Sequence, residues 1–329
     1  MLKQIGSTLL ALGLLLSAYT SASAQERLRL AWAGFSPTNS PIWVIEGRKL
    51  LQKMGVEPEI IAIGNSPTVL QALLAGEIDA ASISVTTLAS SRLAGADTVM
   101  IVGVVPTFVD HIVSVSNITA VEQLKGKTGG VNRLGTTSDL GLRLALTKLG
   151  IEPDKDVKII PTGGTAERFA ALSKGITQFT IIPEPFVAQA EKLGLRNLYN
   201  ISDLRIPFWW NGILSREAIV KSKRPLMLKL ARATVEAIHI IKTEKAYAIS
   251  LFKKNLGVSD PEGLERAYRD YSNAFPEVPY PTPDGVKTML DYAARTNPKA
   301  ATADPKAFVD PSLIKELDSS GFIKQLYKK

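Results

Sequence analysis

The strongest constraint on the fold is a regular succession of short apolar stretches and amphipathic stretches in the first third of the chain. Residues 28–34, 57–64, 77–84 and 98–105 have the length and composition of strands, and the three intervals between them carry helical patterns. Proline, glycine and small polar residues stand at the joints. This alternation predicts an α/β fold with a mainly parallel sheet flanked by helices.

The same alternation returns in the second half of the chain. When Ser66 is placed on Thr165, an offset of 99 positions (165 − 66), the segments 66–83 and 165–182 share four identical residues. Either an internal duplication or similar secondary structure alone can produce such matches. Both explanations predict two similar α/β lobes.

We expect the chain to cross between these lobes twice. The first lobe takes residues 25–110 together with residues 212–329, which include the C-terminal helices, and the second lobe takes residues 111–211. The crossings fall near residues 108–112 and 205–212, where we expect the hinge of a domain closure.

The first 24 residues have the pattern of a secretory signal peptide. Lys3 precedes a mostly apolar stretch, and Ala22 and Ala24 form an A-x-A cleavage site before Gln25. The sequence contains no cysteine, which excludes disulfides, a lipid-modified N-terminal cysteine, thiolate metal ligands and a cysteine nucleophile. We therefore expect a periplasmic protein without a lipid anchor.

The positive charge of the chain is dispersed. Lys and Arg outnumber Asp and Glu by 39 to 31, yet no basic stripe interleaved with aromatic residues occurs, so nucleic acid is not an expected partner. A positive field favours anionic ligands.

The sequence lacks the common catalytic and metal-binding motifs. It has two histidines, His111 and His239, and neither an H-E-x-x-H motif, a G-x-S-x-G motif nor a phosphate-binding G-x-x-x-x-G-K-[ST] loop. We expect each histidine to be a packed or a surface side chain. The chain is therefore predicted to have no catalytic residue, no metal and no cofactor, and not to be an enzyme.

Small polar residues recur where a predicted strand ends and a helix begins. This pattern occurs five times, at residues 36–40, 65–66, 84–87, 133–138 and 163–165. Ligands of open α/β sheets bind beyond the carboxyl ends of the strands, and helix N-termini attract anions. Each joint also has an ordinary capping role, but five of them across two lobes indicate a ligand cleft between the lobes.

Opposite the predicted cleft, two acidic residues precede a strand. Glu77 and Asp79 come before the apolar run that ends at Ser84, so we expect them to lie away from the cleft, solvated or paired with basic groups.

Three segments resemble periplasmic solute-binding proteins of the nitrate/sulfonate/taurine type. Residues 40–84 are similar to the opening of these proteins, residues 121–131 to the start of their second lobe and residues 184–194 to a helix that begins with Glu-Pro. The resemblance extends to about Gly257. It implies the two-lobed type II periplasmic binding protein fold and a substrate-binding component of an ABC importer, a monomer that delivers its ligand to permease subunits in the inner membrane.

The chain departs from this family in one turn. Gln178 stands where the second lobe of relatives often has Asp, at the end of the strand away from the cleft. The family also includes proteins that bind thiamine pyrimidine precursors and an enzymatic branch that forms this pyrimidine with iron and a cysteine-rich motif. A chain without cysteine does not fit that branch.

The resemblance further implies a ligand shell with members from both lobes. These residues are Ser36, Thr38, Asn39, Ser40, Ser84, Thr86, Arg133, Thr136, Thr137, Gly164, Thr165 and Glu184. Arg133 and the net charge favour an anion such as a sulfonate, taurine, nitrate or a carboxylate. Trp43, in the first turn of a predicted helix, adds an aromatic wall that suits a heteroaromatic ligand, so both ligand classes stay open.

Overall fold

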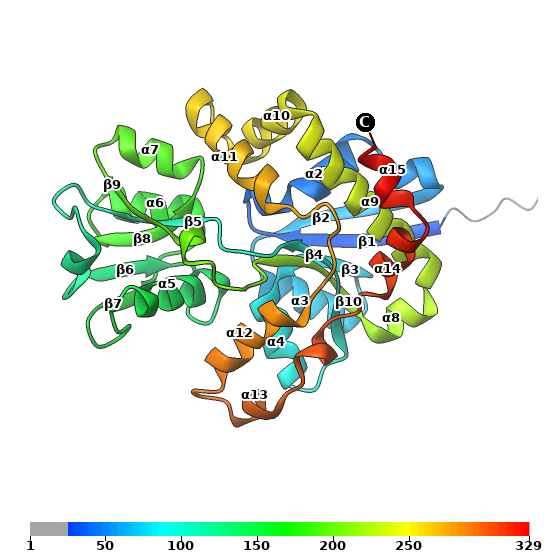
Figure 1. Cartoon of the computed structure of the whole chain (residues 1–329), viewed down its shortest axis with the longest axis horizontal. Coiled ribbons are helices and arrows are strands. Elements are labelled where there is room, and N and C mark those ends of the chain that lie inside the picture. The colour runs from blue at the N-terminus through cyan, green and yellow to red at the C-terminus, as the bar shows by residue number, and fades with distance from the viewer. Residues whose placement is uncertain (1–25, 329) are drawn as a thin grey trace, which may run out of the picture.

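The computed structural model describes residues 26–328 and folds them into two lobes, each with a sheet flanked by helices (Figure 1). The first sheet has the strand order β2 (Val56–Ile63), β1 (Glu26–Ala33), β3 (Ala80–Ser84), β10 (Asn211–Arg216), β4 (Thr98–Val105). The second has the order β7 (Lys158–Pro161), β6 (Thr128–Val131), β8 (Phe179–Pro183), β5 (Asp110–Ser114), β9 (Arg196–Asn200). The predicted two-lobed α/β fold is confirmed.

One strand in each sheet runs against its neighbours. β10 is antiparallel to β3 and β4, and β5 is antiparallel to β8 and β9. Both strands come directly after the chain crosses from the other lobe. The crossing chain enters the sheet at the edge where the other strands end, so its first strand must run in the opposite direction.

The 99-residue offset also relates elements of the two lobes. β3 and β8 have bounds 99 residues apart, and α3 (Ser66–Ala75) begins 99 residues before α6 (Thr165–Ser173). The offset extends to a hydrogen bond at the foot of each sheet. Asp79 Oδ2 accepts from the backbone N–H of Arg29 at 2.8 Å, and Gln178 Oε1 accepts from that of Thr128 at 3.1 Å. The two lobes therefore share one structural unit.

The remaining helices either flank the two sheets or belong to the largely helical C-terminal third of the chain. α2 (Ser40–Gly47) and α4 (Val85–Leu93) flank the first sheet, and α5 (Thr137–Lys148) and α7 (Phe186–Lys192) flank the second (Figure 1). The C-terminal helices are α8 (Glu217–Ser222), α9 (Arg224–Thr243), α10 (Lys245–Leu256), α11 (Pro261–Ala274), α12 (Pro283–Ala293), α13 (Pro298–Thr302), α14 (Ser312–Ser319) and α15 (Phe322–Leu326). No helix within residues 26–328 is long and apolar enough to span a membrane. The predicted signal peptide lies outside the described residues.

α2 is shorter than the helical pattern before Gly55 suggests. It ends at Gly47, and Lys49 takes a left-handed conformation with φ of 52°. A Cβ on Gly47 would lie 2.5 Å from the Tyr247 hydroxyl, so the Tyr247 side chain of α10 packs closely on this glycine. The chain then reaches Gly55 through a short 3₁₀ turn at Gln52–Met54.

The two crossings between the lobes are packed by aromatic rings. Phe108 of the first crossing stacks on Phe208 of the second, with ring centroids 4.2 Å apart and an angle of 11° between the rings. Trp209 Nε1 donates to the Thr282 carbonyl at 2.9 Å. A Cβ on Gly285 would lie 2.9 Å from both the carbonyl carbon of Phe208 and the amide nitrogen of Trp209. The start of α12 thus rests directly on the backbone of the second crossing.

We expect Gly285→Ala to lower the free energy of unfolding by about 2 kcal/mol, because overpacking costs about 1–3 kcal/mol. The added Cβ would meet Trp209 Cδ1 at 2.6 Å and two backbone atoms at 2.9 Å, and the backbone atoms cannot move aside as the end of a side chain can. The gain of up to about 1 kcal/mol from replacing a helical glycine is smaller. Gly64→Ala is the matched control, since no atom lies within 4 Å of its added Cβ. Urea unfolding of both variants measures the difference, and an unchanged Gly285→Ala protein would contradict the packing argument.

Candidate ligand-binding cleft

A cleft of about 430 Å³ lies between the two lobes at the carboxyl ends of their parallel strands. Small-molecule sites occupy roughly 300–1,000 Å³, so the cleft suits a small solute. Its lining comes from the segments after β1, β2, β3, β6, β7 and β8, with Trp210 from the second crossing and Leu256 from the end of α10. The lining residues are Gly34, Phe35, Ser36, Gly64, Asn65, Ser66, Pro67, Ser84, Asn132, Arg133, Thr136, Thr137, Ser138, Gly164, Thr165, Ala166, Glu167, Arg168, Pro183, Phe186, Trp210 and Leu256.

Three helices present their first residues to this cleft. Ser66 begins α3, Thr137 begins α5 and Thr165 begins α6, and all three residues line the cleft. The free N–H groups and partial positive charge of a helix N-terminus stabilise an anion. α3 belongs to the first lobe, and α5 and α6 belong to the second. An anion between the lobes would therefore face helix N-termini from both lobes.

Arg168 is the only arginine that lies buried in the cleft wall among the described residues. Its Nε donates to the Ile181 carbonyl at 2.9 Å, and its Nη2 donates to Thr165 Oγ1 at 3.3 Å. Within residues 26–328, no carboxylate lies within the 4.0 Å of an ion pair with it. Burial lowers the pKa of Arg168, and the charges of Asp110 and Glu167 oppose that shift. The side chain is therefore an oriented cation whose own fold supplies no ion pair.

Asp110 lies behind the cleft wall, fully buried, at the start of β5. Neither carboxylate oxygen has a hydrogen-bond partner among the described residues. Burial raises the pKa of Asp110 to about 7, although the charge of Arg168 acts in the opposite direction.

Hydroxyl groups connect the loops at the base of the cleft. Thr86 Oγ1 lies 3.3 Å from Thr137 Oγ1, a contact between the two lobes. The Ser84 hydroxyl lies 2.8 Å from that of Thr87, and the Ser84 backbone N–H donates to Ser66 Oγ at 3.2 Å. These contacts hold the polar loops of both lobes close together around one space.

The structure brings seven of the thirteen predicted site residues to the lining of the cleft. These seven are Ser36, Ser84, Arg133, Thr136, Thr137, Gly164 and Thr165. The other six do not line it, and these are Thr38, Asn39, Ser40, Trp43, Thr86 and Glu184. A ligand-binding role of the seven stays a prediction.

The first loop turns its middle residues inward instead of toward the cleft. Asn39 donates to the carbonyls of Ala33 and Gly34 at 2.9 and 2.8 Å, and its Oδ1 accepts from Ser82 Oγ at 2.8 Å. Thr38 and Ser40 are buried beside it. Asn39 therefore fixes the loop to the sheet, and Ser36, at the outer side of the loop, reaches the cleft.

Trp43 and Glu184 also have partners elsewhere. Trp43 is buried in the core of the first lobe, with its ring edge-on to Trp32 at 6.0 Å and to Phe252 at 6.4 Å. The aromatic residues that line the cleft are instead Phe35, Phe186 and Trp210. Glu184 is buried against α11, where its Oε1 lies 2.5 Å from Arg266 Nη2. Thr86 reaches only the base of the cleft through Thr137.

Several lining residues were absent from the predicted ligand shell, among them Asn65, Ser66, Ser138, Arg168 and Trp210. The position of Arg168 in the sequence could have indicated that it is buried. It shares one stripe of α6 with the buried Ala171 and Leu172, at the i, i+3, i+4 spacing of an apolar face. A charged residue on such a stripe needs a polar partner inside the protein.

Residues 21–251 match the model of the NMT1-like family. No curated protein matches the sequence. Among solved structures, the periplasmic aliphatic sulphonate binding protein SsuA from Escherichia coli has a TM-score of 0.71 at 21% identity, covering 87% of this chain and 93% of its own. The alkanesulfonate-binding protein SsuA from Xanthomonas axonopodis pv. citri, bound to MOPS, has a TM-score of 0.71 at 19% identity, with 88% and 99% covered.

The periplasmic nitrate-binding protein NrtA from Synechocystis PCC 6803 has a TM-score of 0.70 at 15% identity, covering 90% of this chain and 89% of its own. At these identities the likenesses show the fold. Together with the family match, they confirm the resemblance that the sequence motifs indicated.

Proposed function

Because the chain belongs to the NMT1-like family, we propose that it is a solute-binding protein that captures a small anion between its lobes. In this proposal it works in the periplasm as a monomer without a lipid anchor, after cleavage of a signal peptide at residues 1–24. It delivers its ligand to the permease subunits of an ABC importer, and no bond is made or broken. Candidate ligands are a sulfonate, taurine, nitrate or a carboxylate.

The observation that carries the proposal is the buried cation in the cleft wall. Removing a charge from water is costly unless an opposite charge or several hydrogen bonds compensate it. Arg168 has hydrogen bonds to Ile181 and Thr165, but it has no ion pair within residues 26–328. Asp110 and Glu167 act on Arg168 without forming an ion pair with it. An anionic ligand would supply that ion pair, and the helix N-termini at Ser66 and Thr137 would add donors.

The proposed mechanism is closure of the two lobes around the ligand. We place the moving bodies at residues 25–110 with 212–329 and at residues 111–211. The crossings carry the stacked pair Phe108 and Phe208, which would act as the pivot. A ligand that contacts loops of both lobes stabilises the closed state over the open one, and the permease would recognise that state.

A second ligand class rests on Trp210. Trp210 lines the cleft together with Phe35 and Phe186, so a flat heteroaromatic ligand such as a thiamine pyrimidine precursor would have aromatic neighbours to stack on. This support comes from Trp210 and not from Trp43, which lies in the core.

The test is thermal unfolding of mature protein that has been refolded from denaturant to remove bound ligand. The panel contains taurine, alkanesulfonates, nitrate, aromatic carboxylates and pyrimidine precursors. A ligand at about 100 times its Kd adds about 2.7 kcal/mol, which raises Tm by several degrees. A shift with one class identifies the ligand, and no shift with any member would remove these classes.

Arg133 provides the matched mutational test of the anion proposal. It is an exposed arginine on the rim of the cleft, so Arg133→Ala should weaken binding of the anion about tenfold, the effect of one exposed charge-assisted contact. Arg196 is an exposed arginine of the same lobe that does not line the cleft, and Arg196→Ala should leave the affinity unchanged. Equal effects of the two changes would point to a general charge effect and contradict binding at the rim.

A further inference from the structure

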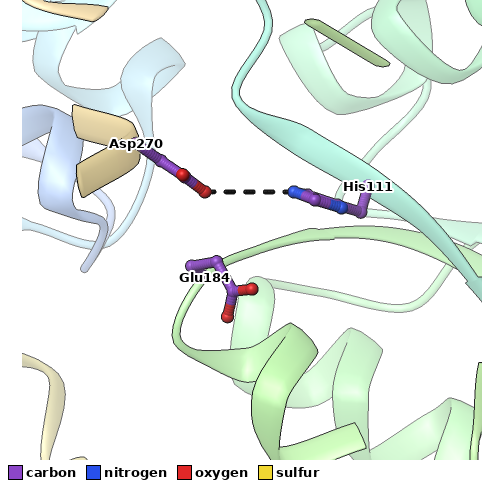
Figure 2. Close-up of side chains that lie close together, drawn as sticks. All are labelled: His111, Glu184 and Asp270. Atoms are coloured by element: carbon purple, nitrogen blue, oxygen red, sulfur yellow. Dashed lines mark ion pairs between the residues drawn. The ribbon is translucent and has the colours of Figure 1, made fainter. Parts of the chain in front are cut away.

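We propose that His111, Glu184 and Asp270 form a site for a first-row divalent transition metal ion such as Zn²⁺. One potential ligand atom of each residue lies within 4.8 Å of those of the other two. The three residues come from β5, from the turn after β8 and from α11, so the site joins the second lobe to the C-terminal helices. Figure 2 shows the His111 ring and the Asp270 carboxylate facing each other, with Glu184 beside the line between them.

His111 is oriented as a metal ligand. Its Nδ1 lies 3.1 Å from Asn197 Oδ1, an oxygen that can only accept, so Nδ1 carries the proton and Nε2 presents a free lone pair. The residue is 6% exposed, and Nε2 has no hydrogen-bond partner among the described residues. Metal-binding histidines have this arrangement, in which one ring nitrogen donates to an oxygen and the other binds the ion.

The spacing between His111 and Asp270 fits a shared ion better than a direct contact. Nε2 lies 4.0 Å from Asp270 Oδ2, too far for a hydrogen bond. Two ligand atoms that each lie about 2.0–2.2 Å from one Zn²⁺ ion are separated by roughly 3–4 Å. A single ion between the two side chains therefore accounts for the separation without a large movement.

Glu184 can join the same ion and keep its present partners. Its Oε1 lies 2.5 Å from Arg266 Nη2, and its Oε2 accepts from the Ala188 backbone N–H at 3.1 Å. Each carboxylate oxygen has a further lone pair, and carboxylates that bind metals are commonly held by such hydrogen bonds. Arg266 also pairs with Glu191 at 2.5 Å, so its charge is offset outside the site.

The charge and ligand types select the ion. Glu184 and Asp270 supply two negative charges for a divalent cation, and Glu191 offsets the charge of Arg266, the partner of Glu184. Arg269 Nε lies 3.6 Å from Asp270 Oδ1, but its side chain is 66% exposed and can turn to solvent when an ion binds. The neutral imidazole favours transition metals over Mg²⁺ and Ca²⁺. Asp270 is the most exposed of the three side chains, at 24%, and gives the ion a path from solvent. Glu184 follows the cleft-lining Pro183, so a bound ion would fix α11 to the second lobe directly beside the cleft.

The test uses tag-free, folded mature protein stripped with a chelator and titrated with Zn²⁺ against a chromophoric competitor. The expected result is one Zn²⁺ per chain. His111→Gln and Asp270→Asn should each weaken that binding by at least about tenfold. His239→Gln, a change at the other histidine of the chain, is the matched control and should leave the affinity unchanged.

Two further measurements keep the result interpretable. Circular dichroism and thermal unfolding in the presence of chelator establish that each variant folds, and Asp270→Asn changes the more exposed ligand if His111→Gln does not fold. Zn²⁺ should raise the Tm of the wild-type chain and of His239→Gln, but not of Asp270→Asn. Absence of Zn²⁺ binding by the wild-type chain, or binding that both ligand variants retain in full, would overturn the proposal.

Discussion

Replacing Asp79 with asparagine is expected to lower the free energy of unfolding by about 3 kcal/mol at neutral pH. Asp79 is 2% exposed, and its carboxylate accepts two hydrogen bonds and has one further ion-pair contact. Its Oδ2 accepts from the Arg29 backbone N–H at 2.8 Å and lies 3.6 Å from Arg29 Nε, and its Oδ1 accepts from Lys223 Nζ at 2.7 Å. Asparagine would direct an NH₂ group at one of these donors.

The expected loss of stability is set by the fact that Asp79 is buried whereas its basic partners are exposed. Removing one member of a buried ion pair costs about 3–5 kcal/mol, because the other charge is left uncompensated. Lys223 and Arg29 reach solvent, with side chains 44% and 40% exposed, which places the expected loss at the lower end of the range.

The effect should depend on pH in one direction. Burial alone would raise the pKa of Asp79, but hydrogen bonds from Lys223 and from the Arg29 N–H, and the charges of both residues, together lower it below 3.8. A carboxyl whose pKa is lowered by folding contributes stability above its unfolded pKa and loses it as pH falls through the folded pKa. The difference between wild type and Asp79→Asn should therefore be full near neutral pH and shrink below about pH 4.

Urea unfolding at several pH values measures this difference, with Asp97→Asn as the matched control. Asp97 forms a similar pair with Arg216 at 2.7 Å, but both side chains are 33% exposed. A surface pair contributes about 1 kcal/mol or less. Equal losses in the two variants, or a loss in Asp79→Asn that stays constant at acid pH, would contradict the burial argument.

Asp79 also shows the reach and the limit of sequence analysis here. Its place at the start of β3, opposite the cleft-lining Ser84, follows from the direction of a parallel strand. Its partner Lys223 is 144 residues away in the sequence, and no local pattern indicates that contact. In the second lobe the uncharged Gln178 accepts the equivalent hydrogen bond from the Thr128 backbone N–H. Its amide nitrogen donates to the Gly175 carbonyl, so this position needs no basic partner.

The alternation of strands and helices predicted the fold class, but not every strand. β9 and β10 have no clear strand pattern in the sequence. β9 is a partly exposed edge strand with little apolar alternation, and β10 is a strand because it pairs between β3 and β4. Pairing partners, more than local propensity, decide such strands.

The sequence predicted where the candidate site lies in the fold, but only part of the side chains that line it. The loops at the carboxyl ends of strands do surround the cleft, as topology requires. Within one loop, however, Ser36 lines the cleft whereas Asn39 turns into the core to bond Ser82. That choice depends on polar groups of β3 and β10, which are distant in the sequence.

Arg168→Met is expected to weaken binding of the anionic ligand about 100-fold, which corresponds to about 2.7 kcal/mol and lies within the range for hydrogen bonds to charged groups. Methionine fills much of the space of the arginine stem but removes the charge and its donors. Arg168→Lys keeps the charge without the planar fork, so its loss should be smaller. Isothermal titration with the anion that gives the largest thermal shift measures both variants.

The stability of the ligand-free protein separates this role from a structural one. Arg168 donates hydrogen bonds to Ile181 and Thr165, but its buried charge has no ion pair within residues 26–328. Loss of the bonds and relief of the desolvation cost oppose each other. Asp110 loses the opposing charge of Arg168, but its pKa is already raised to about 7, so it can take up a proton instead of staying buried as a carboxylate. Arg168→Met should therefore change the free energy of unfolding far less than the binding energy. A variant that binds the anion normally would show that the helix N-termini alone hold it; one that unfolds in proportion to its lost affinity would make Arg168 a structural residue.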